Sequence, residues 1–508
     1  MDVVRERIPI ESPVADLVSA AVAQVDVPVP EGTSVDRVLC CPARLMNVSA
    51  EATSGAVAIS GTVELGVLYL DEVGEVAALT AQCPFKHSLV DSTVEPGMIV
   101  DTRCSVAPAT VTVSPGSLRM ESVVEMEASV FSAGEMMCVT GLTSSEAASR
   151  TSPVSWSRRA GQGAASVTLR EDVELPPGLP DIGAILWPTA RAVVDSVAPR
   201  QAEAQVSGTL MLNVLYRAQD GAVPVQMVDF EIPFSAPVSV PGLREDFAAV
   251  VSVMSADLLL RPCEDIAGNM RVLSVETPLS MRVTGWEQGT RMVVADAYGL
   301  SGELILSREA ADGCTAPHEY TAQAVVSGNW APEQMLPLGM RVVCSAVEPV
   351  VDIAEPSAES LMVSGRLRSR VFYIDGETDE LCCAQGESPF ECRLDLSGLT
   401  DAMRVMVWAD CSHSSVNRSG EGFAVQAGLS LRVLARSITT VDIITQAEMG
   451  EQWDPESMAP LLLVVAGPGD TVWSLARECC VTVETLLEAN PQLADREVQS
   501  GDRIIIVR

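Results

Sequence analysis

Three stretches of this 508-residue chain share one spacing of glycine, tyrosine and phenylalanine. In each, a tyrosine lies eight residues after a Ser-Gly pair. A Pro-Phe pair follows, so that the glycine and the phenylalanine are 24, 26 and 25 residues apart. Successive glycines are separated by 147 and 157 residues, which indicates whole domains in tandem rather than short solenoid repeats. The motif residues are Gly61, Tyr69 and Phe85, then Gly208, Tyr216 and Phe234, then Gly365, Tyr373 and Phe390.

Apolar residues alternate with polar ones in the segments around these motifs. Residues 57–69, 118–130 and 425–435 all show this period of two, and clusters of Gly, Pro, Asp and Ser separate such segments. The pattern indicates half-buried strands joined by turns. We therefore predict a mainly β fold with three tandem antiparallel β-domains, each a sandwich or barrel, over 1–142, 167–306 and 325–445. The tyrosines and Pro-Phe pairs are interpreted as core anchors, with a binding role as the alternative.

Three polar segments are predicted to link the domains. Residues 143–166 are rich in Ser, Ala and Arg, and residues 307–324 join the second domain to the third. Residues 446–460 are polar and punctuated by proline, which is typical of a tether. Within the first linker, Gly161-Gln162-Gly163 superficially resembles a phosphate loop. A strand follows it instead of a helix, so we interpret it as linker.

The last segment, 461–508, has the pattern of a small domain of its own. An apolar strand over 461–465 leads into a Gly-Pro-Gly-Asp-Thr turn, and a closing strand covers 503–507. Between them a first helix is predicted from four apolar residues at i, i+3, i+4 and i+7, and a second helix from Thr482 to the Asn490-Pro491 stop. The four residues are Val472, Leu475, Ala476 and Cys479. We predict an α+β unit with strand–helix–helix–strand order.

The residues of this segment resemble a LysM module throughout. The resemblance is carried by GDTVWSLA at 469–476, LLEANP at 486–491 and GDRI at 501–504. It implies binding of N-acetylglucosamine glycans, chitin or peptidoglycan, in a shallow groove. The groove would be lined on one side by Gly469, Asp470, Thr471 and Val472, and on the other by Asn490, Pro491, Gln492 and Leu493.

Several of these residues also have a structural interpretation. Asp470 or Thr471 is a helix N-cap, Trp473 is a core residue rather than a sugar platform, and Asn490 ends a helix. The chain has Cys479-Cys480 where LysM modules usually have Tyr-Gly. Because a side chain makes a left-handed residue costly by roughly 1–2 kcal/mol, the helix junction is expected to differ from that of the family.

Composition narrows the possible functions. The net charge of −35 argues against nucleic-acid binding, which needs clustered Lys and Arg. The N-terminus has no signal-peptide pattern and no apolar run is long enough to span a membrane, so the fourteen cysteines are expected to be reduced thiols in the cytoplasm. There is no Cys-x-x-Cys, the three histidines have no ligand spacing, and no catalytic motif occurs. We expect no metal, no cofactor and no enzymatic activity.

Tandem β-domains followed by one LysM module resemble the SPOCS-domain spore-coat morphogenetic proteins of endospore-forming bacteria. The resemblance implies a non-enzymatic scaffold or adaptor, made in the mother cell and located at the forespore surface or spore coat. Its LysM module would dock on a coat basement-layer protein. The alternative is a peptidoglycan-binding protein that uses the same module on glycan. Arg366, Arg368 and Arg370 share one strand face in the third copy, as a solvated stripe or a contact for an acidic partner.

Overall fold

The computed structural model describes residues 2–30, 34–114, 116–143, 145–219, 223–255, 257–454, 459–494 and 496–508. Most of them lie in antiparallel strands, which confirms the predicted mainly β class. The first copy comprises β1 (Asp2–Pro28), β2 (Arg37–Cys40), β3 (Ala43–Thr53), β4 (Ala56–Leu70), β5 (Val76–Val90), β6 (Ile99–Val106), β7 (Thr110–Ser114) and β8 (Ser117–Thr143). The second comprises β9 (Ala147–Glu174), β10 (Ile182–Arg200), β11 (Glu203–Ala218), β12 (Val225–Ser239), β13 (Ala248–Ser255), β14 (Leu259–Glu264) and β15 (Met270–Gly299). The third comprises β16 (Gly302–Cys314), β17 (His318–Trp330), β18 (Arg341–Ser357), β19 (Ser360–Ile374), β20 (Leu381–Asp395), β21 (Met403–Ser419) and β22 (Gly422–Gln452).

Each copy folds as a sandwich of two sheets. In the second copy β11 lies between β10 and β12 in one sheet, and β15 pairs with β9, β13 and β14 in the other. The first copy repeats this arrangement around the central strands β4 and β8, and the third copy repeats it around β19 and β22. Apolar residues from both sheets of a copy fill one core, as the alternating pattern predicts.

The repeated motif is explained by strand pairing. Gly61, Gly208 and Gly365 lie directly across from the aromatic residues Phe85, Phe234 and Phe390 on the neighbouring strand. The phenylalanine ring covers the glycine, and in the second and third copies a backbone carbonyl of the bulged third strand also approaches the position that a Cβ would take. A spacing of 24–26 residues is therefore the length of one hairpin. The three phenylalanines are buried, as are Tyr69 and Tyr216, which confirms the core-anchor interpretation for these residues. Tyr373 is half-buried, and the prolines of the Pro-Phe pairs are exposed.

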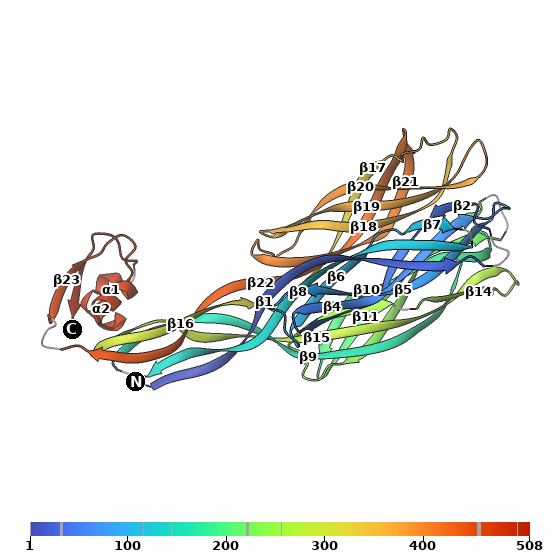
Figure 1. The fold of residues 1–508 in the computed structure, drawn as a ribbon. Coiled ribbons are helices and arrows are strands. Elements are labelled where there is room, and N and C mark those ends of the chain that lie inside the picture. The colour runs from blue at the N-terminus through green and yellow to red at the C-terminus, as the bar shows by residue number, and fades with distance from the viewer. Residues whose placement is uncertain are drawn as a thin grey trace.

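A six-stranded stalk extends from the three sandwiches. The ribbons β1–β8, β9–β15 and β16–β22 continue past their own cores, as Figure 1 shows, and pack together through apolar residues. These residues include Ile8, Met136, Val154, Val293 and Ile443, which come from all three copies. The predicted linkers 143–166 and 307–324 are therefore wrong: apart from short turns, both are strand. The linker at 446–460 is wrong up to Gln452, where β22 ends, and 455–458 lie outside the described residues.

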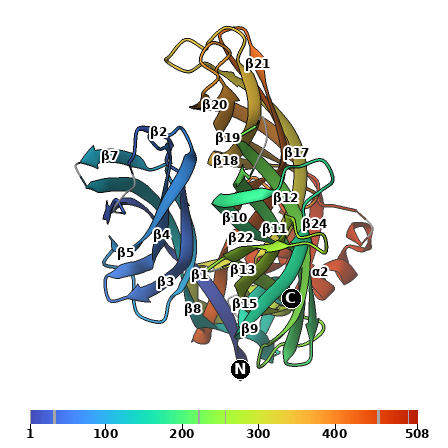
Figure 2. The same ribbon diagram turned by 90° about the vertical axis from the view of Figure 1, so that its right-hand side faces the viewer.

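All three copies contribute wall residues to a central cavity of about 1650 Å³. Figure 2 shows the strands of the first copy beside those of the second and third copies. At one end the cavity is closed by an apolar junction of the three copies that includes Cys40, Trp187 and Phe372. At the end towards the stalk, the Arg436 guanidinium lies 4.4 Å from the centre of the Phe131 ring and 4.8 Å from that of Trp286. We call this group the neck.

The neck also holds two carboxylates. Glu11 and Asp101 lie 3.0 and 2.8 Å from the Arg436 guanidinium, and Arg159 lies 3.8 Å from Glu11. The side chains of Arg436 and Glu11 are only 6% and 2% exposed. Phe131, Trp286 and Arg436 occupy matching register positions in β8, β15 and β22, so one cation and two aromatic rings converge where the three copies meet.

The C-terminal module has the predicted strand–helix–helix–strand order. Its elements are β23 (Leu461–Val465), α1 (Val472–Glu478), α2 (Val483–Ala489), a 3₁₀ turn (Pro491–Leu493) and β24 (Arg503–Val507), and β23 pairs antiparallel with β24. The inner faces of the helices and of this sheet form one apolar core.

Candidate functional site

The turn that leads into α1 is fixed by hydrogen bonds within the C-terminal module. Thr471 is the N-cap, as one of the two predicted alternatives has it: its hydroxyl accepts from the Ser474 N–H, and the Ser474 hydroxyl accepts from the Thr471 N–H. The Asp470 carboxylate accepts from the Gly467 N–H at 2.7 Å. The turn is thus rigid before any ligand binds.

The eight residues of the predicted groove divide into two groups. Gly469, Thr471, Pro491 and Gln492 are exposed and would form the rim of the predicted groove, with Asp470 half-buried beside Gly467. The other three are part of the module's framework. Val472 and Leu493 belong to the same apolar core. Asn490 is fully buried, donates to the Leu486 and Ile505 carbonyls and accepts from the Ile505 N–H, so its side chain holds α2 to β24.

The junction between α1 and α2 keeps a left-handed residue although no glycine is present. Cys480 has a φ of 56°. The Cys480 N–H donates to the Arg477 carbonyl and the Val481 N–H to the Ala476 carbonyl, the two bonds of a Schellman turn. The prediction that this junction differs from that of the LysM family is therefore wrong. The hydrogen bonds of the turn and the burial of Cys479 and Val481 hold the strained conformation in place.

Replacing Cys480 with glycine is expected to stabilise the module by about 1 kcal/mol, because glycine adopts a positive φ without steric cost. Slower hydrogen exchange of the α1 and α2 amides in the full chain would measure the gain. Cys480→Ala is the control, since alanine keeps the strain and loses only the thiol. Equal exchange rates in the two variants would contradict the strain argument.

Two family models match the chain. The model described as SipL, SPOCS domain matches residues 34–114, 181–258 and 340–418, one stretch in each copy. The LysM domain model matches residues 465–507. The chain therefore resembles a SipL-like protein, with three SPOCS domains followed by one LysM domain. Its domains are of non-catalytic binding types and fit a sporulation-related protein with a peptidoglycan-binding LysM domain. Neither the curated proteins nor the solved structures compared with the chain gave a match.

The LysM domain is attached to the end of the stalk by specific contacts. The carboxylate of Asp296, a buried residue of β15, accepts from the Trp473 indole N–H at 2.9 Å and from the Arg477 guanidinium at 3.0 Å. The Tyr298 hydroxyl donates to the Val481 carbonyl at 2.8 Å, and its ring packs edge-on against Trp473 at 5.0 Å. Trp473 is therefore an anchor to the second SPOCS domain rather than a sugar platform.

The outer face of the LysM sheet is apolar and open. Five of its side chains are between 43 and 65% exposed, and the sixth position of the face is the exposed Arg503. The five are Leu461, Leu463, Val465, Ile505 and Val507. The inner side chains Ile504 and Ile506 fill the core instead. A contiguous apolar face of this kind on a small domain is typical of a protein-contact surface.

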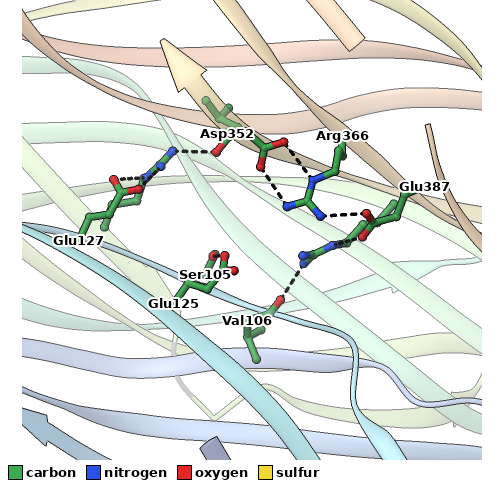
Figure 3. Close-up of polar contacts among 10 residues, drawn as sticks. Ser105, Val106, Glu125, Glu127, Asp352, Arg366 and Glu387 are labelled. Carbon is green, nitrogen blue, oxygen red and sulfur yellow. Dashed lines mark hydrogen bonds and ion pairs between the residues drawn. The ribbon is translucent and has the colours of Figure 1, made fainter. Parts of the chain in front are cut away.

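Two of the three arginines of β19, Arg368 and Arg370, line the central cavity, and the remaining one, Arg366, is more exposed. Figure 3 shows Arg366 between Asp352 and Glu387, at 3.0 and 2.9 Å. Arg368 contacts Glu387 at 2.9 Å and donates to the carbonyl of Val106 in the first SPOCS domain. Burial raises the pKa of Glu387, but the hydrogen bonds from Arg368 and Arg366 outweigh it and leave that pKa below its ordinary value.

Arg370, the third arginine of the stripe, lies in the wall of the central cavity. The prediction of a solvated stripe is therefore wrong for Arg368, whose side chain is 10% exposed. The stripe thus contacts the first SPOCS domain through Arg368 and forms part of the cavity wall. The contact of Arg368 with Val106 could not be predicted from the sequence, because these two residues are 262 positions apart.

Among the described residues, no group of three or more His, Cys, Asp or Glu side chains is arranged to hold a metal ion. No helix among the same residues has the length and apolar character needed to cross a bilayer.

Proposed function

We propose that this protein is a non-enzymatic adaptor in assembly of the spore coat or envelope, and that its LysM domain docks on a coat basement-layer protein. In this proposal the protein is made in the mother cell and acts at the forespore surface. The SPOCS domains form the body of the adaptor and the stalk presents the LysM domain at its end (Figure 1).

The observation that carries this proposal is the open apolar face of β23 and β24. A groove for sugars does not require exposed leucine, valine and isoleucine on the opposite side of the domain, whereas a protein contact gains free energy from burying them. Leu463 and Ile505 are cross-strand partners in the middle of this face. None of the six positions of this face is acidic, although the chain as a whole has a net charge of −35. This composition favours a partner with an apolar surface and a carboxylate opposite Arg503.

The second candidate function is peptidoglycan binding through the LysM groove. It is favoured by the rim of exposed residues at Gly469, Thr471, Pro491 and Gln492, which leaves the edge of the groove accessible in the full chain. The capped and hydrogen-bonded turn at Thr471 is also preorganised for a ligand.

Paired variants of the full chain separate the two functions. Leu463→Ser with Ile505→Ser removes the apolar face, and Thr471→Asn with Gln492→Ala alters the groove rim while keeping a capping side chain at the start of α1. We expect the face variant to lose roughly tenfold or more of its affinity for the partner, and to disperse from the forespore surface when sporulating cells are imaged by immunofluorescence. The rim variant is expected to keep wild-type localisation.

Binding of purified sacculi, with chitin oligomers as competitor, supplies the second measurement. Dispersal of the rim variant and normal localisation of the face variant, together with competed sacculus binding, would overturn the docking proposal in favour of glycan binding. Because all four side chains are surface residues, fold stability is expected to stay within about 0.5 kcal/mol of wild type, which circular dichroism can check.

A further inference from the structure

The junction that closes the central cavity brings together thiols from two SPOCS domains. Cys40, Cys344 and Cys383 pack in this apolar cluster, the first from the first domain and the others from the third. All are free cysteines. Cys40 and Cys383 each belong to a pair of adjacent cysteines, so one member of each pair has a neighbour in the other domain.

Strand β2 lies beside β20 and sets the position of these thiols. The Arg37 guanidinium donates to the Leu381 carbonyl at 2.7 Å and contacts the Glu380 carboxylate at 3.2 Å. Cys40 and Cys383 lie three residues after Arg37 and two residues after Leu381, and both side chains pack in the apolar cluster between the domains. The two domains therefore contribute one thiol each to the same cluster.

The adjacent cysteines point elsewhere. Cys41 packs in the core of the first domain, and Cys382 contacts the Tyr373 hydroxyl. This follows from strand geometry, in which neighbouring side chains lie on opposite faces. The chain thus supplies matched control thiols one residue away from the pair.

Cys40 also meets two conditions for reactivity. It forms part of the cavity wall, next to the cavity residue Arg370. A hydrogen bond from Cys383, helped by Arg370, holds the pKa of the Cys40 thiol below its ordinary value in spite of burial, while the same hydrogen bond and burial raise the pKa of Cys383. Burial raises the pKa of Cys344 and of Cys41 to about 12, so these neighbours stay protonated.

We propose that Cys40 and Cys383 are a redox modification site, at which a low-molecular-weight disulfide converts the two thiols into a disulfide bond joining the first and third SPOCS domains.

The reaction is a double thiol–disulfide exchange. The Cys40 thiolate attacks one sulfur of the small disulfide through the cavity, forms a mixed disulfide and releases the first small thiolate. Cys383 then gives up its proton and attacks the Cys40 sulfur, and the second small thiolate leaves. The released thiolates take up the protons from Cys40 and Cys383. Two protein thiols are oxidised and one small disulfide is reduced to two thiols.

The test uses the full chain and hydroxyethyl disulfide as the oxidant. We expect non-reducing proteolysis followed by tandem mass spectrometry to give a linked peptide pair with Cys40 bonded to Cys383, whose mass is two hydrogens below the sum of the two free peptides. Because the bond closes a loop of more than three hundred residues, the oxidised protein is expected to unfold at a temperature several degrees higher than the reduced protein.

Cys382→Ser is expected to leave the link and the thermal shift intact, and Cys383→Ser to abolish both. Cys263, a partly exposed thiol outside the cluster, reports that the oxidant has reacted by forming a mixed disulfide. A mixed disulfide at Cys263 without any link at Cys40, or a link from Cys40 to Cys344 in place of Cys383, would overturn the proposal.

Discussion

Replacing Arg436 with methionine is expected to destabilise the protein by about 3 kcal/mol, because it leaves the carboxylates of Glu11 and Asp101 in the neck without their main cation. The change also removes the contacts of the guanidinium with Phe131 and Trp286. The midpoint of urea unfolding measures the loss. Arg366→Met, which breaks ion pairs that are more than a third exposed, is the control and is expected to cost at most about 1 kcal/mol.

The carboxylate side of the same cluster should respond differently. Burial raises the pKa of Glu11 above its ordinary value of 4.5 in spite of Arg436 and Arg159. The folded state therefore holds this proton at pH values where the unfolded chain has lost it, and stability falls as the pH rises from about 4.5 through the folded pKa. Glu11→Gln cannot ionise, so it should lack this fall and cost little at neutral pH. Equal losses for Glu11→Gln and Arg436→Met would contradict this account of the neck.

Gly365→Ala is expected to cost about 3 kcal/mol, because the added methyl group would lie 2.0 Å from the Val350 carbonyl oxygen and 3.0 Å from the Phe390 ring. The backbone of a bulged strand and a buried ring must both move to accommodate it. Unfolding by urea again gives the measurement, and hydrogen exchange localises the effect to the third SPOCS domain.

The equivalent glycine of the first SPOCS domain is a built-in comparison. At Gly61 the added carbon would meet the Phe85 ring at 2.9 Å and the Met46 carbonyl oxygen only at 3.3 Å, so Gly61→Ala is expected to cost about 1 kcal/mol. The same motif position should thus tolerate a side chain better in the first domain than in the third. A reversed order would show that the bulge carbonyl does not set the cost.

The period-two pattern was sufficient to predict antiparallel β-domains, because each of their strands has one face in the core of its own domain, but it left the choice between sandwich and barrel open. It was not sufficient for the stalk. Residues 147–160 and 307–314 alternate less clearly, because a two-stranded ribbon leaves much of both faces exposed and buries only a narrow row of side chains against other copies. When each copy is considered alone, the polar and small residues of these segments therefore predict a linker.

Contacts between residues far apart in the sequence could not be predicted at the candidate sites either. The LysM elements and the cap at Thr471 followed from local signals, whereas the attachment of Trp473 to Asp296 joins residues 177 positions apart. Arg436 and Glu11 are separated by 425 positions. A clue to the neck was present in the sequence, since Phe131, Trp286 and Arg436 follow the same alternating strand in each copy, but their convergence depends on how three domains are arranged around one axis.

The stalk has a consequence for the order in which the protein can form. Its third ribbon pairs Gly302 with Gln452, and the LysM domain rests on Tyr298, so neither contact exists until nearly the whole chain has left the ribosome. Each sandwich can close early from nearby strands, while the six-stranded bundle must wait for the last one. Contacts of such large sequence separation form slowly. A chain ended before Gly422 would therefore lose the shared bundle that holds all three domains together, and not the third domain alone.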